Sequence, residues 1–474
     1  MIRRYLLLLS VISIFIFLTG CPEQESTQQL LADLQSPPEE ITIKILAAQK
    51  LSERLDPEAI PYLIAALADA NPQVRQNVAD ALVVYGVELP EETIPELRDN
   101  LASNSDLIRT EIMGILSRIG KPAIPALRKA LKSNNTFVKL NSIKILGEIG
   151  DKSVIFDLIQ TLEETKSEEI QVLCAISLAK LKSPAAIESL QKLLNETRSD
   201  DVKIQAIRAI GELESKDSAI LLIKQLDDSK VNPGVKVVAL ESLEKMGIES
   251  PELKKSLTAL VSSDNDRLRM ESIYLLNKLG DKRGLKFLWE DIDEKYQAQA
   301  QLAIITLGRT RDSSKETIAA LNKALKFENE TLRIISAKSL VLCGDDNGKK
   351  VLTECLRSCS DTGNKLLAID YISDLKMKEA SPILLELLRS SNDFAMINSI
   401  LSAIKAMDLK EAVPELKDKY MKLSTQPELK IVIVEVLNTF HTPEAKTVFQ
   451  ELLKYEDDKD RYFHYEINKI IQGW

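Results

Sequence analysis

Four cysteines beyond the first 21 residues are the side chains of this chain best suited to nucleophilic, redox or metal chemistry. Cys355 and Cys359 are four positions apart, so both thiols share one face of a predicted helix, and Cys343 ends the preceding helix. A zinc ion would need four ligands, and neither a histidine nor a second close cysteine pair accompanies these residues. Two interpretations remain open: a disulfide between Cys343 and either Cys355 or Cys359, or thiols buried, like Cys174, as small hydrophobic side chains.

The two histidines offer little for acid–base chemistry. His441 lies in a Thr-Phe-His-Thr-Pro turn and His464 lies among aromatic residues, and neither has a nucleophile in a recognisable setting. The chain also contains neither a P-loop nor a Gly-x-Gly-x-x-Gly motif. The sequence therefore predicts a protein that is not an enzyme and that holds no cofactor and no metal.

A recurring basic residue is the most regular polar feature of the sequence. In most units it stands near the start of a predicted helix, directly after an aliphatic residue. Lys365, which follows Asn364, holds the same place less perfectly, as do Gln171, Gln299 and Met396. We call this series the ladder: Lys44, Arg75, Arg109, Lys139, Lys203, Lys236, Arg269, Arg333, Lys365 and Lys430. Such a stripe could attract an acidic ligand, but the helix dipole disfavours a cation in the first turn. We therefore predict a structural role, in which each cation pairs with carboxylates or loop carbonyls of neighbouring repeats.

Residues 121–150 are the cleanest copy of the unit that the ladder marks. They predict two short helices: Pro125 suits a first turn, Asn135 lies in a polar break, and Gly150 suits a helix end. Neighbouring units are about 30 to 34 residues apart, and many close on a glycine. A second marker lies 14 residues before the ladder position in four units: Pro61, Pro95, Pro125 and Pro382. Neither helix could bury its apolar face alone, so stacked copies are expected.

This pattern resembles HEAT repeats, particularly the bacterial kind related to the HEAT-like repeats of phycobilisome lyases. The resemblance covers residues 38–474 and predicts an all-α fold, an α-solenoid of roughly a dozen two-helix HEAT-like repeats. It implies antiparallel helix pairs stacked into a right-handed superhelix, with the second helices on the concave side. Residues 285–310 depart from the pattern by lacking the basic residue, and residues 349–376 and 414–439 lack the closing glycine.

The N-terminal residues predict where in the cell the protein is located. Residues 1–20 pair a basic start, Arg3 and Arg4, with an apolar run too short to be a comfortable membrane span. Residues 18–21, Leu-Thr-Gly-Cys, resemble a bacterial lipobox, which implies cleavage after residue 20 and lipidation of Cys21. Because Pro22 replaces the aspartate that retains such proteins in the inner membrane of enteric bacteria, we expect the outer membrane, with the chain facing the periplasm or the cell surface. An ordinary cleaved leader and an uncleaved signal anchor are the alternatives.

Both ends of the array are expected to differ from its middle. Residues 21–37 are predicted to be a flexible tether, and residues 38–55 supply only a second helix, a capping half-unit. At the other end, aromatic residues that are rare elsewhere are predicted to cap the last apolar face: Tyr455, Tyr462, Phe463, Tyr465 and Trp474.

Candidate partner-binding residues lie five positions after the ladder, on the predicted concave face. They are Asp80, Lys144, Arg208, Glu241, Tyr274, Lys338, Asp370 and Glu435. They carry charges of both signs, and the chain has a net charge of −9, which predicts a protein or peptide partner and argues against nucleic acid. We expect a monomeric solenoid.

The leading hypothesis is thus a lipid-anchored scaffold of the bacterial cell envelope that binds protein or peptide partners without catalysis. One alternative is an enzyme or enzyme accessory like the phycobilisome-lyase relatives, which bilin binding would reveal by absorbance. The other is a structural envelope spacer without a tight partner.

Overall fold

The computed structural model describes residues 25–423, 426–456, 467–468 and 470–471, which form 27 α-helices and no strand. The chain divides into two compact units, unit 1 (Met1–Ile248) and unit 2 (Glu249–Trp474). The predicted leader, the proposed lipid-attachment residue Cys21, His464 and four of the aromatic cap residues lie outside the described residues.

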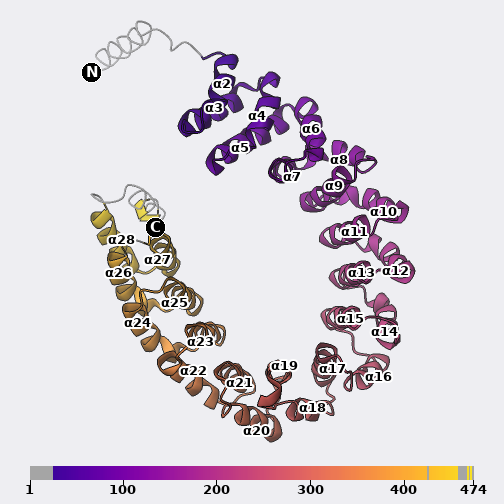
Figure 1. Ribbon diagram of the computed structural model, residues 1–474, viewed down its shortest axis with the longest axis vertical. Coiled ribbons are helices and arrows are strands. Elements are labelled where there is room, and N and C mark those ends of the chain that lie inside the picture. Colours follow the sequence, from indigo (N-terminus) through magenta and orange to yellow (C-terminus); the bar gives the residue numbers. More distant parts are fainter. Residues whose placement is uncertain (1–24, 424–425, 457–466, 469, 472–474) are drawn as a thin grey trace, which may run out of the picture. The chain divides into compact units, whose positions relative to one another are not determined.

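Seven helix pairs make up the described part of unit 1. The first helices are α2 (Thr27–Leu34), α4 (Ile60–Ala66), α6 (Pro90–Asp99), α8 (Ile124–Ala130), α10 (Ile155–Glu164), α12 (Ile187–Glu196) and α14 (Ala219–Asp227). The second helices are α3 (Ile41–Arg54), α5 (Pro72–Glu88), α7 (Asp106–Ile119), α9 (Thr136–Ile149), α11 (Glu168–Lys180), α13 (Asp200–Glu212) and α15 (Pro233–Lys245). Within this unit the second helices form one layer and the first helices form another (Figure 1).

Unit 2 contains six further pairs and one last helix in its described residues. The first helices are α16 (Pro251–Leu260), α18 (Leu285–Glu290), α20 (Lys315–Ala324), α22 (Asn347–Ser358), α24 (Ser381–Ser390) and α26 (Val413–Lys422). The second helices are α17 (Asp266–Lys278), α19 (Gln297–Thr310), α21 (Glu330–Leu342), α23 (Thr362–Asp374), α25 (Phe394–Met407) and α27 (Pro427–Phe440), and α28 (Pro443–Glu456) follows. Pairs form even where a marker is missing, as in α18 with α19. The predicted all-α solenoid of about a dozen two-helix repeats is confirmed.

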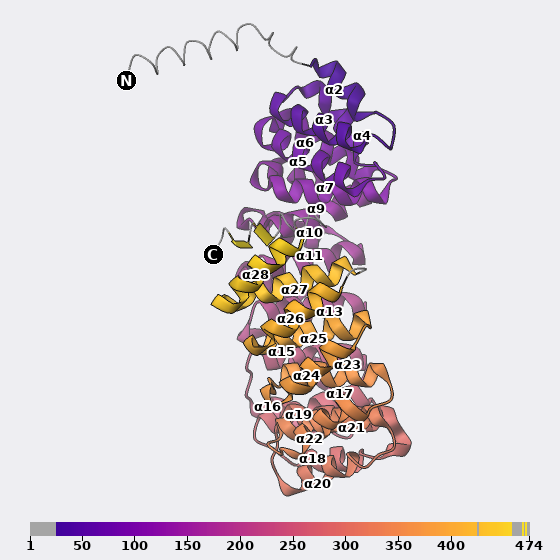
Figure 2. The same cartoon turned by 90° about the vertical axis from the view of Figure 1, so that its left-hand side faces the viewer.

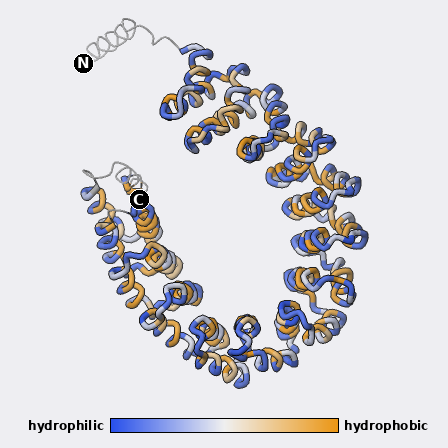
Figure 3. The backbone as a smooth tube through the Cα atoms, in the orientation of Figure 1, coloured by the Kyte–Doolittle hydropathy of each residue, from blue (hydrophilic) through white to orange (hydrophobic). Residues whose placement is uncertain are grey.

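The core of each unit lies between its two helix layers. Consecutive pairs stack side by side within a unit (Figure 2), and apolar residues gather where the helices meet (Figure 3). In the pair α8 and α9, Leu127, Ile143 and Leu146 are fully buried. Burial of such a side chain contributes about 1.5–3 kcal/mol, which explains why neither helix is stable without its neighbours.

Local sequence signals set the ends of α9. The side-chain oxygen of Asn135 accepts hydrogen bonds from the backbone N–H groups of Phe137 (2.9 Å) and Val138 (3.3 Å), which is an N-cap. Gly150 ends the helix in the left-handed conformation, with φ 73° and ψ 11°, which costs glycine no steric strain. The predicted break at Asn135 and end at Gly150 are confirmed.

The N-terminal end of the array corrects the predicted tether. Thr27–Leu34 forms helix α2, whose Leu30, Leu31 and Leu34 are buried, and α2 packs on α3. Residues 38–55 are therefore not a half-unit, because α3 has a first helix as its partner. Three leucines within five positions suffice for an eight-residue helix once α3 covers them, although they are too few for a clear periodic pattern.

The closing glycines of the repeats fall into two structural classes. Gly120, Gly150 and Gly280 follow helix ends and have positive φ angles. Gly86, Gly147, Gly211 and Gly308 instead lie inside second helices, where a Cβ atom would collide with the next second helix. Three of these four glycines face a serine: Ser177 for Gly147, Ser242 for Gly211 and Ser339 for Gly308.

Each of these glycine–serine seams also holds a hydrogen bond between the two helices. The serine hydroxyl donates to the backbone carbonyl four residues before the glycine, at 3.1 Å for Ser177 to Ile143, 3.3 Å for Ser242 to Ile207 and 2.9 Å for Ser339 to Ile304. A Cβ on Gly147 would lie 2.6 Å from Ser177 Oγ and 3.1 Å from its Cα atom. The close approach therefore depends on glycine, since the neighbouring backbone would have to move.

Gly147→Ala is expected to lower the stability of the protein by up to about 2 kcal/mol, because overpacking costs about 1–3 kcal/mol and alanine recovers roughly 1 kcal/mol of helix propensity over glycine. The shift in denaturant midpoint of the full-length chain measures the effect.

Gly114→Ala is the matched control, because Gly114 also lies inside a second helix but its Cβ would meet no atom within 4 Å. It is expected to stabilise the chain by about 0.5–1 kcal/mol. Midpoint shifts of the same sign for both variants would contradict the role of the seam.

The cysteines adopt a pairing that the sequence interpretation did not contain. The disulfide joins Cys355 to Cys359, and Cys343 and Cys174 are free and buried. Of the two alternatives, a disulfide of Cys343 with Cys355 or Cys359 is wrong, and burial as a thiol is confirmed for Cys174 and Cys343. The sulfur of Cys343 donates to the backbone carbonyl of Leu307 at 3.5 Å. Burial raises the pKa of the Cys174 and Cys343 thiols to about 12, so both are protonated near neutral pH.

Candidate functional site

Arginines of the ladder bind the loop that precedes their own helix. The Nη1 groups of Arg75, Arg269 and Arg333 donate to the backbone carbonyl six residues earlier, at 2.9, 3.1 and 2.7 Å. Arg109 makes the same bond to the carbonyl of Ser103. In three of these loops the side chain of the accepting residue, Asp69, Ser103 or Ser263, also caps the N–H two residues later.

Several ladder cations also reach carboxylates of the next repeat. The Nζ atom of Lys44 lies 2.7 Å from Asp69, Arg75 Nε lies 3.3 Å from Glu111, and Arg269 Nη2 lies 3.0 Å from Asp291. The other lysines vary: Lys236 donates to the carbonyl of Leu226 (2.8 Å), Lys430 lies over the ring of Tyr420, and Lys139, Lys203 and Lys365 are half-buried. The arginines of the ladder thus use their N–H groups for hydrogen bonds within the fold.

All eight predicted partner-binding residues lie on second helices, and several are engaged with the next second helix. Asp80 pairs with Arg118 (2.6 Å), Lys338 pairs with Asp374 (2.8 Å), and Asp370 accepts from Ser399 (3.4 Å). Arg309 lies over the ring of Tyr274, 4.0 Å from its centroid. Lys144, Arg208 and Glu435 are exposed.

Arg208 and Glu241 are the two predicted positions that line one hollow. It measures about 580 Å³ and lies on the second-helix face of unit 1, across α11, α13 and α15. Ile176, Ala179, Ala209 and Gly211 supply its apolar part, and Gln205 and Ser242 supply neutral polar groups. Gly211 belongs to a glycine–serine seam, so the absence of a side chain both brings α15 close and leaves the hollow unfilled.

The charged groups around this hollow are mostly basic. They are Lys180, Lys182, Arg208 and Lys245, with Glu212 and Glu241 as the acidic members. Lys245 Nζ lies 2.6 Å from Glu212, so one pair is neutralised. Among the described residues, Lys180, Lys182 and Arg208 make no ion pair, and all three are exposed. The hollow therefore combines an apolar floor with uncompensated positive charge.

Sequence reasoning missed the three lysines of this hollow. Lys180 and Lys245 are the last residues of α11 and α15, and Lys182 follows α11 in a left-handed conformation with φ 48°. The sequence prediction considered only one position in each second helix, five residues after the ladder, and these lysines lie at other positions. Basic residues in the last turns of neighbouring second helices were the available signal, since cations are favoured at helix C-termini.

A second hollow of about 510 Å³ lies in unit 2 beside Tyr274, Gly308 and Arg309. Its floor is again next to a glycine–serine seam. Arg309 is bound to Glu271 (Nη2 to Oε2, 3.0 Å) as well as stacked on Tyr274. That arginine is thus engaged by two neighbouring side chains.

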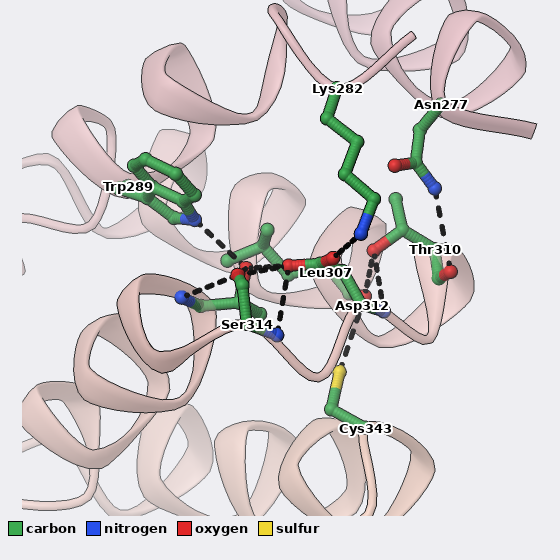
Figure 4. Close-up of polar contacts among 9 residues, drawn as sticks. Asn277, Lys282, Trp289, Leu307, Thr310, Asp312, Ser314 and Cys343 are labelled. Carbon is green, nitrogen blue, oxygen red and sulfur yellow. Dashed lines mark hydrogen bonds and ion pairs between the residues drawn. The ribbon is translucent and has the colours of Figure 1, made fainter. Parts of the chain in front are cut away.

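A buried carboxylate in unit 2 is the other arrangement of side chains that could take part in chemistry (Figure 4). The side chain of Asp312 is fully buried and accepts from Lys282 Nζ (2.7 Å), from Thr317 Oγ1 (2.6 Å) and from the hydroxyl of Ser314. The indole N–H of Trp289 donates to Thr317 Oγ1 at 3.0 Å. These contacts join α18, α20 and the loops before them, which is a structural role rather than a reactive one.

The protonation of Asp312 follows from these contacts. Burial by itself raises the pKa of the carboxyl group, but the hydrogen bonds from Lys282, Ser314 and Thr317 outweigh it and lower the pKa to about 2. A carboxyl group whose pKa is lower in the folded chain stabilises the fold above its ordinary pKa of about 3.9. That stabilisation is lost as the pH falls through about 4 toward 2.

Asp312→Asn is expected to lower stability at pH 7 by about 1–3 kcal/mol, because it removes a buried charge-assisted network. The variant should also lose less stability than the wild type between pH 4 and pH 2. Denaturant unfolding of the full chain at several pH values measures both effects. Asp264→Asn, an exposed aspartate of the same unit, should change neither; a wild-type pH profile for Asp312→Asn would contradict the assignment.

Two features are absent from the described residues, a metal-binding cluster and a membrane-spanning helix. No cluster of three or more histidine, cysteine, aspartate or glutamate side chains in the described part could hold a metal ion. No described helix combines the length and the apolar character that crossing a membrane requires.

Comparison with known proteins finds a similarity in two parts of unit 1. The family of HEAT repeats matches residues 27–115 and 155–243. The first matched range begins at the first residue of α2. No curated protein matches the sequence.

Among solved structures, 206 chains are similar. Kap121p bound to Pho4p is 12% identical, with 94% of this chain and 66% of that chain covered and a TM-score of 0.48. Kap95p bound to RanGDP is 13% identical, with 94% of this chain and 74% of that chain covered and a TM-score of 0.49. YibA of E. coli is 20% identical, with 57% of this chain and 97% of that chain covered and a TM-score of 0.43. The chain thus spans just under two thirds of the Kap121p chain, and identities this low concern the fold alone.

Proposed function

We propose that this HEAT-repeat solenoid is a non-catalytic scaffold that binds a protein or peptide partner on the second-helix face of unit 1. In this proposal a lipid on Cys21 tethers it to the bacterial cell envelope. The observation that carries the proposal is the hollow of about 580 Å³ across α11, α13 and α15. Its volume is within the roughly 300–1,000 Å³ typical of binding pockets, which suits a few side chains of a partner.

The character of the hollow supports a macromolecular partner. Interface centres are enriched in arginine and in well-packed apolar contacts, and Arg208 stands here beside Ile176 and Ala209. The same face also exposes apolar side chains nearer the N-terminus, such as Leu46 of α3 and Val84 of α5. Partner contacts could therefore extend over several repeats, which is the usual advantage of a solenoid.

The tether rests on sequence alone. The basic start, the short apolar run and the Leu-Thr-Gly-Cys box favour lipidation of Cys21, and two or more acyl chains give durable anchoring, at about 0.8 kcal/mol per buried CH₂ group. Pro22 favours the outer membrane over the inner membrane.

Partner binding is tested by site-specific photo-crosslinking in intact envelopes. A photoreactive residue in place of Gln205, which lines the hollow, is expected to give a discrete crosslinked product. The same residue in place of Lys224, exposed on first helix α14, should give none. Absence of products from Gln205 and also from Lys144 and Glu435 would favour the spacer alternative.

Cys21→Ala is expected to abolish incorporation of labelled fatty acid and to release the protein from the membrane fraction. Gln24→Ala, three residues beyond the box, should keep both label and membrane association. Persistent membrane association of Cys21→Ala would refute lipidation as the tether.

A further inference from the structure

The hollow of unit 1 has a charge that contrasts with the rest of the molecule. The chain carries a net charge of −9, yet four of the six charged side chains around the hollow are basic. After the Lys245–Glu212 pair is set aside, Lys180, Lys182 and Arg208 face one glutamate, Glu241. A local positive surface on an acidic protein selects a short anionic ligand, because a long polyanion would be repelled by the surrounding surface.

Helix-end electrostatics explains part of this arrangement but not all of it. Lys180 and Lys245 end α11 and α15, where a cation interacts favourably with the helix dipole. Arg208 lies inside α13, however, and makes no ion pair among the described residues. Its exposed guanidinium group is therefore available, and its planar fork is suited to a carboxylate.

The apolar part of the hollow is small and held in place. Ala179, Ala209 and Gly211 leave room for one small or medium apolar side chain beside the charged groups. The seam between Gly211 and Ser242 fixes α15 against α13, with Ser242 Oγ donating to Ile207 at 3.3 Å. A floor that does not have to reorganise lowers the entropic cost of binding.

We infer that this hollow recognises an acidic peptide segment of the partner, in which carboxylate side chains flank one apolar side chain that rests on the floor between Ile176 and Ala209. The carboxylates contact Arg208, Lys180 and Lys182. This inference rests on the proposed function and adds the chemistry of the partner to it.

The test uses two fluorescein-labelled probe peptides of equal length and the full-length protein in detergent. One peptide has the sequence Asp-Glu-Leu-Asp-Glu, and its neutral twin is Asn-Gln-Leu-Asn-Gln, both with blocked ends. Fluorescence anisotropy at low salt is expected to show about tenfold or greater preference for the acidic peptide, and salt should reduce that preference.

Charge variants locate the binding. Arg208→Glu and Lys182→Glu should each remove most of the preference, whereas Arg208→Lys should keep part of it. Lys224→Glu, an exposed lysine of α14 outside the hollow, changes the net charge equally and should leave the preference intact. Circular dichroism of each variant checks that the helices are unchanged.

Equal binding of the two peptides, no binding of either, or equal losses with Lys224→Glu and Arg208→Glu would each overturn the inference. None of these results would by itself refute the scaffold, because crosslinking from Gln205 judges partner binding without reference to charge. A crosslinked partner together with equal peptide binding would therefore keep the proposed function and reject only the acidic segment.

Discussion

Close contact between successive second helices is the constraint on which the rest of the structure depends. At the seams Gly147–Ser177, Gly211–Ser242 and Gly308–Ser339, one helix lacks a side chain where the next approaches. The serine hydroxyl then reaches a backbone carbonyl of the first helix. Each repeat of a solenoid contacts only its neighbours, so each interface between neighbours must supply its own stability. The seams make that contact both tight and hydrogen-bonded.

The ladder arginines have a different role, which is to hold the loop between the two helices of a pair in place. A short loop between two helices contains backbone carbonyl groups that neither helix satisfies. Arg75, Arg269 and Arg333 each donate to such a loop carbonyl and thereby join the start of the second helix to the loop that follows the first. Contacts to Glu111 and Asp291 extend the bond to the next repeat. The dipole penalty of a cation in the first turn is offset by these bonds, and for Arg269 also by Asp266 three residues before it.

The hollow lies where some charged side chains are not used in contacts between neighbouring helices. The ladder arginines donate to carbonyl groups within the fold, and several charges of the second-helix face, such as Asp80 and Lys338, pair with the next helix. Across α11, α13 and α15 the pattern changes, because the glycine of the seam leaves space and three basic side chains lack ion partners in the described chain. Function in a repeat protein is expected at such places, where one unit departs from the others.

The sequence by itself determined the repeat, because its signals act within a few residues. Caps such as Asn135, stops such as Gly150 and helical periodicity fix where helices begin and end without reference to distant residues. Only the tertiary structure decided which glycines face a neighbouring helix, that Cys355 pairs with Cys359, and that α2 packs on α3. It also decided the composition of the hollow, since Lys180, Arg208 and Lys245 lie on three different helices. Their convergence depends on how the repeats stack, and that stacking is set by packing between side chains far apart in the sequence.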